Sequence, residues 1–278
     1  MSGQPTISVL VPTCARIDLL ERCLSSILRE IAEFDEGDVE IIVSNDGDPN
    51  DLVLVQKRFS GAIFLRGPQQ GPARNRNHAA RAAKGDWLVF IDDDCIASPG
   101  WLSAYSARFS GADVLEGKTI ADRKRIRFDE ESPVNERGGF LWSCNFAIRR
   151  ELFEEMGGFD EDYPFAAMED VDLRLRLEAR KAKFQFVETA VVLHPYRRVS
   201  GMKMTRRRLD SHFIFWEKHK SEQPSNHGYF FFFLAARSFL KVTLPGIFRY
   251  RGRGLVWRLS HDLVYFQYAL LCWLRIRR

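Results

Sequence analysis

Short apolar runs alternate with amphipathic segments along most of the chain. The runs have the length and β-branched content of strands, and the segments between them carry apolar side chains at helical spacing. We expect strands at residues 6–13, 39–44, 62–65, 87–91 and 184–193, and helices that begin near residues 18, 52, 71, 151 and 168. Strands that alternate with helices predict an α/β fold with a mainly parallel sheet flanked by helices.

The expected central strand is Trp87–Ile91, five apolar residues without any polar alternation. Such a run predicts a strand that is buried on both faces of the sheet. Asp92, Asp93 and Asp94 follow it directly. Burying three unpaired carboxylates would cost several kcal/mol, so we expect them at the open end of the strand, facing a cation. Mg²⁺ and Mn²⁺ prefer carboxylate oxygens and are often shared with substrate phosphates, although a simple acidic turn is the alternative interpretation.

Polar clusters also follow two other expected strands, at Pro12-Thr13 and at Asp46-Gly47. Ligands of doubly wound sheets bind beyond the carboxyl ends of the strands, so these clusters and the three aspartates predict one site at one sheet edge. No G-x-G-x-x-G follows the first strand and no G-x-x-x-x-G-K-[ST] occurs, which disfavours dinucleotide and P-loop sites. Phosphates bound here would therefore need a metal ion and arginines.

Local signals place several helix ends. Asp18 with Glu21 three residues later has the pattern of a capping box. Pro72 is expected near the first turn of its helix and Gly85 just after its last turn. Glu169 and Asp170 fall in the first turn of a later helix, where acidic residues also complement the helix dipole without any further function.

The net charge of +4 hides a division of the chain. Residues 1–196 carry 24 Lys/Arg against 33 Asp/Glu, whereas residues 197–278 carry 17 against 4. This asymmetry predicts an acidic domain at 1–197 and a basic, aromatic helical region at 198–278. The five cysteines form no CxxC pair, so neither a disulfide framework nor a zinc site is indicated. We expect a reducing compartment and no signal peptide.

Aromatic and apolar runs such as Tyr229–Leu234 and Leu263–Leu274 alternate with basic clusters such as Arg249–Arg253 in the C-terminal region. The apolar runs are about a dozen residues long, which is too short to span a bilayer, and Pro245 is expected to end the first of them. This composition favours helices that lie in an anionic membrane interface. A helical subdomain packed on the core or on another subunit is the alternative, and no nucleic-acid-binding motif accompanies the charge.

Eight short sequence motifs are distributed along residues 6–197. They are Pro12-Thr13, Asn45–Gly47, Gly71–Asn75, Asp92–Asp94, Asn145–Arg150, Gly157–Asp160, Glu169–Asp172 and His194–Arg197. In these motifs and their order the chain resembles the family 2 glycosyltransferases, which have the GT-A fold. The resemblance implies a nucleotide-sugar donor, usually a UDP-sugar, a divalent metal ion (Mn²⁺ or Mg²⁺) and inverting transfer of the sugar to an acceptor hydroxyl.

The resemblance also implies roles for individual residues. Nucleotide and donor binding would fall to Pro12, Thr13 and Asp46 at the base, Arg74 near base and phosphates, Asp93 at the ribose, Asp92 as the other half of the Asp-x-Asp motif with Asp94, Asn145 in the sugar pocket, and Arg197. The metal would be held by Asp94, Asp92 and His194. Asp170 would be the general base, with Glu169 beside it. A departing nucleoside diphosphate needs a cation, and an attacking hydroxyl needs a carboxylate on the opposite face of the sugar.

From these patterns we expect an enzyme of cell-envelope polysaccharide or lipopolysaccharide synthesis with a glycan or lipid-linked acceptor. Its expected location is the cytoplasm, peripheral at the inner face of the plasma membrane. The charged segment Asp122–Arg137 is expected to close over the substrates. Two alternatives stay open. One is a non-catalytic membrane or glycan-binding scaffold, and the other is a sugar nucleotidyltransferase, which normally has a glycine-rich basic loop after its first strand.

Overall fold

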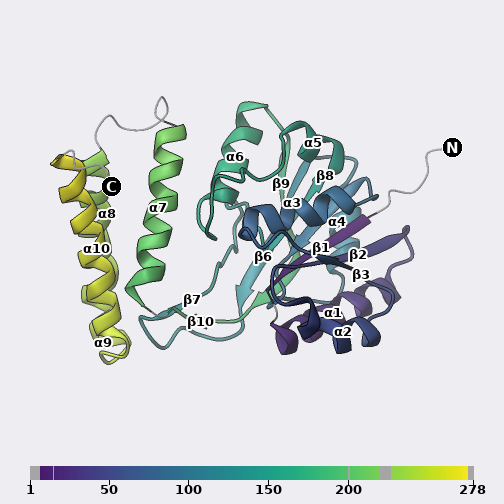
Figure 1. Ribbon diagram of the computed structural model, residues 1–278, viewed down its shortest axis with the longest axis horizontal. Helices are drawn as coiled ribbons and strands as arrows, with labels where there is room; N and C mark the ends of the chain where they lie inside the picture. Colours follow the sequence, from purple (N-terminus) through teal and green to yellow (C-terminus); the bar gives the residue numbers. More distant parts are fainter. Residues whose placement is uncertain (1–6, 15, 200, 220–226, 275–278) are drawn as a thin grey trace. The chain divides into compact units, whose positions relative to one another are not determined.

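The computed structural model describes residues 7–14, 16–199, 201–219 and 227–274 (Figure 1). Two compact units make up the chain. The first comprises Met1–Asp122 and Pro133–Pro195, and the second comprises Arg123–Ser132 and Tyr196–Arg278. The short segment Arg123–Ser132 thus belongs with the C-terminal region, which the charge pattern along the sequence did not indicate.

The first unit is built on an eight-stranded mixed sheet (Figure 1). Its strands, in spatial order, are β3 (Ile63–Arg66), β2 (Val39–Asn45), β1 (Ile7–Thr13), β4 (Trp87–Ile91), β8 (Asn145–Arg149), β6 (Val114–Ala121), β9 (Phe184–His194) and β5 (Ile96–Ala97). The pairs among β3, β2, β1 and β4 are parallel, and β8 runs antiparallel to both β4 and β6. The expected α/β fold with a mainly parallel sheet is confirmed.

Helices cover both faces of this sheet. They are α1 (Ile17–Glu33), η1 (Pro49–Leu52), α2 (Val53–Arg58), α3 (Pro72–Ala82), α4 (Trp101–Ser106), α5 (Arg150–Glu155) and α6 (Glu169–Ala179). Successive residues of a strand point to opposite faces. Val89 of β4 accordingly packs in a cluster with side chains of α1, α2 and α4, whereas Phe90 packs in a second cluster with α3, α5 and α6. All five residues of β4 are buried, as their unalternating apolar sequence predicts.

Two of the expected helix ends differ from the structure. Helix α1 begins at Ile17 after Arg16, without a side-chain cap, so Asp18 lies in the first turn and is not the N-cap. Glu21 pairs with Arg58 instead of closing a capping box. Helix α3 has proline at its start as predicted, but it ends at Ala82, before Gly85. A Cβ on Gly85 would lie 2.5 Å from the backbone nitrogen of Ser8, so close packing requires this glycine.

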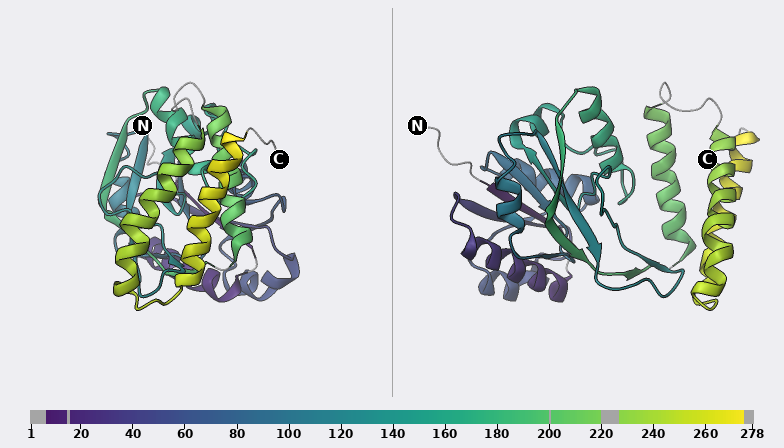
Figure 2. Two further views of the ribbon diagram at one scale, coloured as in Figure 1. Left: turned by 90° about the vertical axis from the view of Figure 1, so that its left-hand side faces the viewer. Right: turned by 180° about the vertical axis from the view of Figure 1, so that it is seen from behind.

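The second unit consists of a two-stranded ribbon and four α-helices among its described residues. Its elements are β7 (Glu130–Glu131), β10 (Arg197–Arg198), α7 (Met202–Lys218), α8 (His227–Ser238), the π-helical turn η3 (Phe239–Thr243), α9 (Leu244–Arg249) and α10 (Leu255–Trp273). Strands β7 and β10 pair in antiparallel fashion. Helices α8 and α10 run side by side, with α9 at their common end (Figure 2). Segment 122–137 is thus partly a strand of this ribbon, and its predicted closure over substrates stays a prediction.

The prediction that Pro245 ends the first C-terminal apolar run is wrong. The helix continues from Gly228 to Arg249, 22 residues, through α8, η3 and α9. Proline breaks an α-helix because it has no N–H and its ring crowds the preceding turn. Here a π turn precedes it, in which the Leu244 N–H donates to the Phe239 carbonyl five residues back. By length and composition this helix is sufficient to cross a membrane, contrary to the expected dozen residues.

Candidate functional site

Three strand ends meet at one edge of the sheet, as the polar clusters predict. Thr13 at the end of β1 lies in register with Asn45 at the end of β2. Asn75 of α3 ties these ends together, because its side-chain amide donates to the carbonyls of Thr13 and Ser44 at 3.2 and 3.0 Å. The next strand, β4, ends at Ile91 beside β1, and the three aspartates follow it. The edge is therefore a rigid frame for the acidic segment.

The three aspartates are held by different partners. Arg76 donates to Asp92 Oδ1 at 2.8 Å. The Thr13 hydroxyl donates to Asp93 Oδ2 at 2.6 Å, and the Arg16 guanidinium pairs with both Asp93 and Asp94. Burial raises the pKa of the Asp93 carboxyl to about 6, although Arg16 and the Thr13 hydroxyl favour its ionised form. Asp93 and Asp94 are both almost completely buried, so each depends on these partners.

Arg76 connects the aspartates to the acidic pair at the start of α6. Its side chain is 5% exposed, and it donates to Glu169 Oε1 at 3.1 Å as well as to Asp92. The guanidinium also lies 5.7 Å from the ring centre of Phe159. One buried cation is thus shared by two carboxylates from segments far apart in the sequence. This arrangement places the acidic triplet and Glu169 in one site.

Helix α6 is positioned by the loop that precedes it. Asn77 of α3 holds that loop through both backbone groups of Phe159, at 2.8 and 2.9 Å. Met168 then takes a left-handed conformation, with φ of 74°, directly before Glu169. A non-glycine residue in this conformation carries strain of about 1–3 kcal/mol, and such strain is concentrated at functional sites. The strained turn delivers Glu169 and Asp170 to the buried side of the helix start.

Both acids of this pair are protonated more readily than free side chains. Burial and the neighbouring Asp170 charge raise the pKa of Glu169 to about 7, against the opposing influence of Arg76. Burial raises the pKa of Asp170 to about 6, while Arg76 and the Val171 N–H favour its ionised form. The Val171 N–H donates to Asp170 Oδ1 at 2.8 Å. Asp170 thus has a backbone donor, in addition to the charge of Arg76, that favours its carboxylate form.

His194 at the end of β9 faces the third aspartate. Its Nδ1 donates to the Pro195 carbonyl at 2.9 Å, and its Nε2 lies 3.4 Å from Asp94 Oδ1. A neutral imidazole with the proton on Nδ1 presents a lone pair at Nε2. That lone pair and a carboxylate oxygen repel one another unless a proton or a cation lies between them. Both side chains are fully buried, so this pair of ligand atoms fits a divalent ion.

Cys95 also lies within reach of Asp94 and His194. Burial raises the pKa of its thiol well above the usual value, which keeps the sulfur protonated. Mg²⁺ and Mn²⁺ prefer oxygen and imidazole ligands to a neutral thiol. Cys95 therefore fits the surrounding core better than the ligand set.

Two further residues that are predicted to bind the nucleotide-sugar donor lie at the same sheet edge. Pro12 is buried within β1, next to Thr13. Asp46 accepts a hydrogen bond from the Gln69 N–H at 2.9 Å, and burial raises the pKa of its carboxyl. Arg74, on the first turn of α3, pairs with Glu161 at 3.5 Å and stays 39% exposed. A partly exposed guanidinium of this kind is available to a phosphate.

Asn145, which is predicted to line the sugar pocket, makes all its side-chain hydrogen bonds within the protein, and its place in that pocket stays a prediction. The side chain is 2% exposed. Its oxygen accepts from the Trp101 indole and the Tyr105 hydroxyl at 2.9 and 2.8 Å. Its amide donates to the carbonyls of Lys118 and Ala190 at 3.0 and 3.1 Å. An asparagine can make four such bonds, and all four are made within the protein, which gives Asn145 a structural role.

Arg197 lies in the second unit. It is an exposed residue of β10, and its backbone pairs with Glu131 of β7. Its predicted place near the donor stays a prediction.

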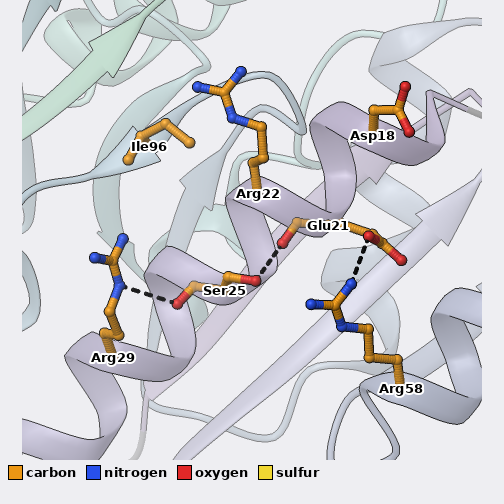
Figure 3. Close-up of a pocket in the computed structure, with 7 residues that line it drawn as sticks. All are labelled: Asp18, Glu21, Arg22, Ser25, Arg29, Arg58 and Ile96. Atoms are coloured by element: carbon orange, nitrogen blue, oxygen red, sulfur yellow. Dashed lines mark hydrogen bonds and ion pairs between the residues drawn. The ribbon is translucent and has the colours of Figure 1, made fainter.

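One surface hollow of about 490 Å³ lies beside α1 (Figure 3). Its lining residues are Asp18, Glu21, Arg22, Ser25, Arg29, Arg58 and Ile96. Arg58 is already paired with Glu21 at 2.8 Å. The hollow contains none of the predicted site residues.

Arg16 and Arg76 are the site residues that the sequence predictions lack. Both lie just outside motifs noted in the sequence, Arg16 three residues after Pro12-Thr13 and Arg76 directly after Gly71–Asn75. The available signal was charge balance, since buried aspartates need nearby cations.

Comparison with known proteins agrees with this geometry. The family model described as Glycosyl transferase family 2 matches residues 8–157, more than half of the chain. The chain belongs to glycosyl transferase family 2. The predicted family and its GT-A fold are therefore confirmed.

Among the relatives of this family 2 member, O-antigen biosynthesis protein RfbC of Myxococcus xanthus is 27% identical over 210 residues, covering 64% of this chain and 16% of that protein. Putative colanic acid biosynthesis glycosyl transferase WcaA of Escherichia coli K12 is 24% identical over 287 residues, covering 93% and 92%. The chain spans from 16% to 52% of the length of the first three relatives that it matches. The crystal structure of GalNAc-T7 with UDP, GalNAc and Mn²⁺ superposes with a TM-score of 0.60 at 14% identity, over 94% of this chain and 57% of that one.

Proposed function

We propose that this protein is a metal-dependent inverting glycosyltransferase. It moves a sugar from a nucleotide-sugar, most simply a UDP-sugar, to a hydroxyl of a glycan or lipid-linked acceptor in cell-envelope polysaccharide or lipopolysaccharide synthesis. The observation that carries this proposal is the Arg76 bridge, which joins Asp92 of the acidic triplet to Glu169 beside Asp170. Family membership, the O-antigen and colanic acid relatives, and the UDP and Mn²⁺ of GalNAc-T7 support it.

In this proposal Asp94 and His194, with Asp92, hold a Mn²⁺ or Mg²⁺ ion. When bound, the ion would stabilise the negative charge that develops on the departing nucleoside diphosphate. Pro12, Thr13, Asp46 and Asp93 line the nucleoside end of the site, and the exposed guanidinium of Arg74 meets the phosphates. Arg197 is proposed to contribute to donor binding.

Asp170 is proposed to take the proton from the acceptor hydroxyl as that oxygen attacks the sugar. A general base must be ionised before it acts, and a pKa of about 6 satisfies this condition at neutral pH. Glu169 is paired with Arg76, so we assign it a positioning role that keeps α6 in register with the acidic triplet. The acceptor and the membrane are proposed to meet the enzyme in the cytoplasm, at the inner face of the plasma membrane.

Binding of UDP, GDP, dTDP and CMP, measured by calorimetry with and without Mn²⁺, tests the proposal. We expect the wild type to bind one of them, UDP, in a metal-dependent manner, and Asp94→Asn to lose the dependence on metal. Asp86→Asn is the matched control, because Asp86 is exposed and precedes the opposite end of the same strand. No binding of any nucleotide by the wild type would overturn the transferase proposal and favour a scaffold. The configuration of the transferred sugar, read by NMR, decides whether transfer inverts.

A further inference from the structure

The polarity of helix α10 is the reverse of that of a surface helix in a soluble protein. Its side chains with more than a third of their surface exposed are Val256, Leu259, Leu263, Phe266, Gln267, Leu270 and Trp273. Their spacing of three and four residues makes one continuous stripe along the helix. No charged residue lies in this stripe. Gln267 is its one polar member among the described residues of the helix.

The charged residues of α10 point inward instead. Arg258 and Asp262 are 8% and 3% exposed, and they pair with one another at 3.0 Å. The Thr243 hydroxyl of the neighbouring helix donates to Asp262 at 2.6 Å and accepts from Arg258 at 2.9 Å. The Ser238 hydroxyl also bonds to both. The two helices, which run side by side (Figure 2), are therefore joined through a polar network, and the exposed stripe of α10 is left without charge.

An apolar surface of this size is expected to contact a membrane or another protein rather than water. The stripe runs the length of a 19-residue helix, or ~28 Å at ~1.5 Å per residue. The helix beside it adds exposed apolar side chains, including Phe233, Leu240 and Phe248, at 66%, 61% and 86% exposure. Soluble monomers rarely expose continuous apolar patches so large, and such patches mark membrane or protein interaction sites.

We call residues 227–274 the hairpin. Its charges indicate what covers the apolar stripe of α10. This segment contains six Lys/Arg residues and a single acidic residue, Asp262, which is already paired. Arg249, Arg251 and Arg253 gather at the turn before α10. At the other end of the hairpin Trp273 packs on Tyr229, with ring centres 5.7 Å apart, and such aromatics suit the membrane interface. Positive charge beside an apolar stripe matches anionic lipid head groups over acyl chains.

Two basic side chains oppose a full crossing of the bilayer. Arg237 and Lys241 are exposed near the middle of the helix Gly228–Arg249. A crossing would place both at the hydrocarbon centre, where charged side chains are expensive. Lying in the plane of the interface, the hairpin can keep both at the level of the phosphates.

We infer that the hairpin 227–274 lies in the membrane interface, with the outward stripe of α10 inserted among the acyl chains and its arginines on anionic head groups. This inference rests on the membrane location given under the proposed function, and it adds the element and the face that bind. It assigns the polar network of Arg258, Asp262, Ser238 and Thr243 a structural role, which is to hold the two helices together while their outer faces leave water.

Sedimentation of the full chain with phosphatidylglycerol–phosphatidylcholine vesicles tests this face. We expect the wild type to bind these vesicles far better than phosphatidylcholine alone. Leu263→Glu/Leu270→Glu should weaken binding by roughly a hundredfold, because two inserted leucines are lost. Val53→Glu/Leu54→Glu is the matched control, since these side chains are 43% and 75% exposed on α2 of the first unit. If the Glu variant fails to fold, Leu263→Gln/Leu270→Gln takes its place with the same expected loss.

Several results would overturn the inference. They are a wild type that stays in solution with anionic vesicles, a stripe variant that binds like the wild type, and a lipid-free dimer that the stripe variant dissociates. The last result would make a second copy of the chain the cover. UDP binding is measured on the same samples, so a wild type that binds UDP but does not bind the anionic vesicles refutes this inference and leaves the transferase proposal standing.

Labelling of Arg253→Cys in spheroplasts separates interfacial from crossing placement. A membrane-impermeant maleimide should reach this residue only after lysis, as it should the exposed native Cys14. Labelling of Arg253→Cys, but not of Cys14, in intact spheroplasts would show that the turn crosses the membrane and would refute the interfacial placement.

Discussion

Replacing Arg76 by methionine removes the one cation that the acidic triplet and the α6 acids share. Methionine keeps much of the length and the apolar stem of the side chain but has no charge. Asp92 and Glu169 would lose partners at 2.8 and 3.1 Å, and Glu169 is almost fully buried. Breaking a buried ion pair from one side costs about 3–5 kcal/mol, since the remaining charge stays without compensation. For a chain of this size we expect the unfolding temperature to fall by roughly 10 °C.

The cost should depend on pH in a definite direction. The pKa of Glu169 is already raised to about 7 by burial and by Asp170, and Arg76 opposes that rise. Without Arg76 the folded-state pKa of Glu169 moves higher still, further above its unfolded value. A group with a raised folded-state pKa contributes stability at low pH and loses it as pH rises through that pKa. The deficit of Arg76→Met should therefore be larger at about pH 8 than at about pH 5, where Glu169 is protonated in both proteins.

Differential scanning calorimetry of four proteins at the two pH values measures this effect. They are the wild type, Arg76→Met, Arg76→Met/Glu169→Gln and the control Arg81→Met. Arg81 lies on the same helix but is 61% exposed, and its pair with Glu161 should contribute less than about 1 kcal/mol. The double variant should recover much of the loss at high pH, because it removes the charge left without a partner. Equal deficits at both pH values, or strictly additive single changes, would refute the shared-cation argument.

Two further predictions concern catalysis and the core. Asp170→Asn should lower kcat by about 10²–10⁴-fold with unchanged UDP affinity. Wild-type kcat should rise with pH through about 6 as Asp170 ionises. An Asp170→Asn enzyme that stays active would exclude Asp170 as the base. Asn145→Leu should lower the free energy of unfolding by about 3 kcal/mol or more, because four buried groups lose their partner. The KM of the folded enzyme for the nucleotide-sugar donor should not change. A raised KM for that donor would favour the predicted place of Asn145 in the sugar pocket.

The parts of the fold that were predictable are those written in local patterns. Strand β4 has an unbroken apolar sequence, and β1 and β2 are mostly apolar, interrupted by Ser8 and Glu40. The polar residues at the ends of these strands lie where the rule for α/β sheets expects a ligand site. Strand β6 was not predicted, because Glu116, Gly117 and Lys118 interrupt its apolar pattern. The structure explains each interruption by a distant partner. Glu116 pairs with Arg174, and a Cβ on Gly117 would lie 2.3 Å from Tyr105 and Asn145.

The residues of the candidate site also differ in how far the local sequence predicts them. Acidic residues at strand ends and at a helix start are visible as clusters in the sequence. Their counter-charges are not, because Arg16 and Arg76 reach carboxylates that lie far along the chain. The surroundings of Asn145 were not visible in the sequence for the complementary reason. Its motif position points to the sugar pocket, but the partners that consume its hydrogen bonds come from α4, β6 and β9.

The C-terminal hairpin shows why counting apolar letters along a sequence underestimates apolar surface. Arg258 and Asp262 interrupt the apolar run of α10 in the sequence, yet both are buried, so its outward face stays free of charge. Pro245 interrupts the run before it, yet a π turn carries the helix past it. Arg258 and Asp262 are accommodated by partners on the inner side of the hairpin, whereas Pro245 is exposed and is accommodated by a local change of winding. Membrane contact depends on the face that remains, and that face becomes visible only when the two helices are packed together.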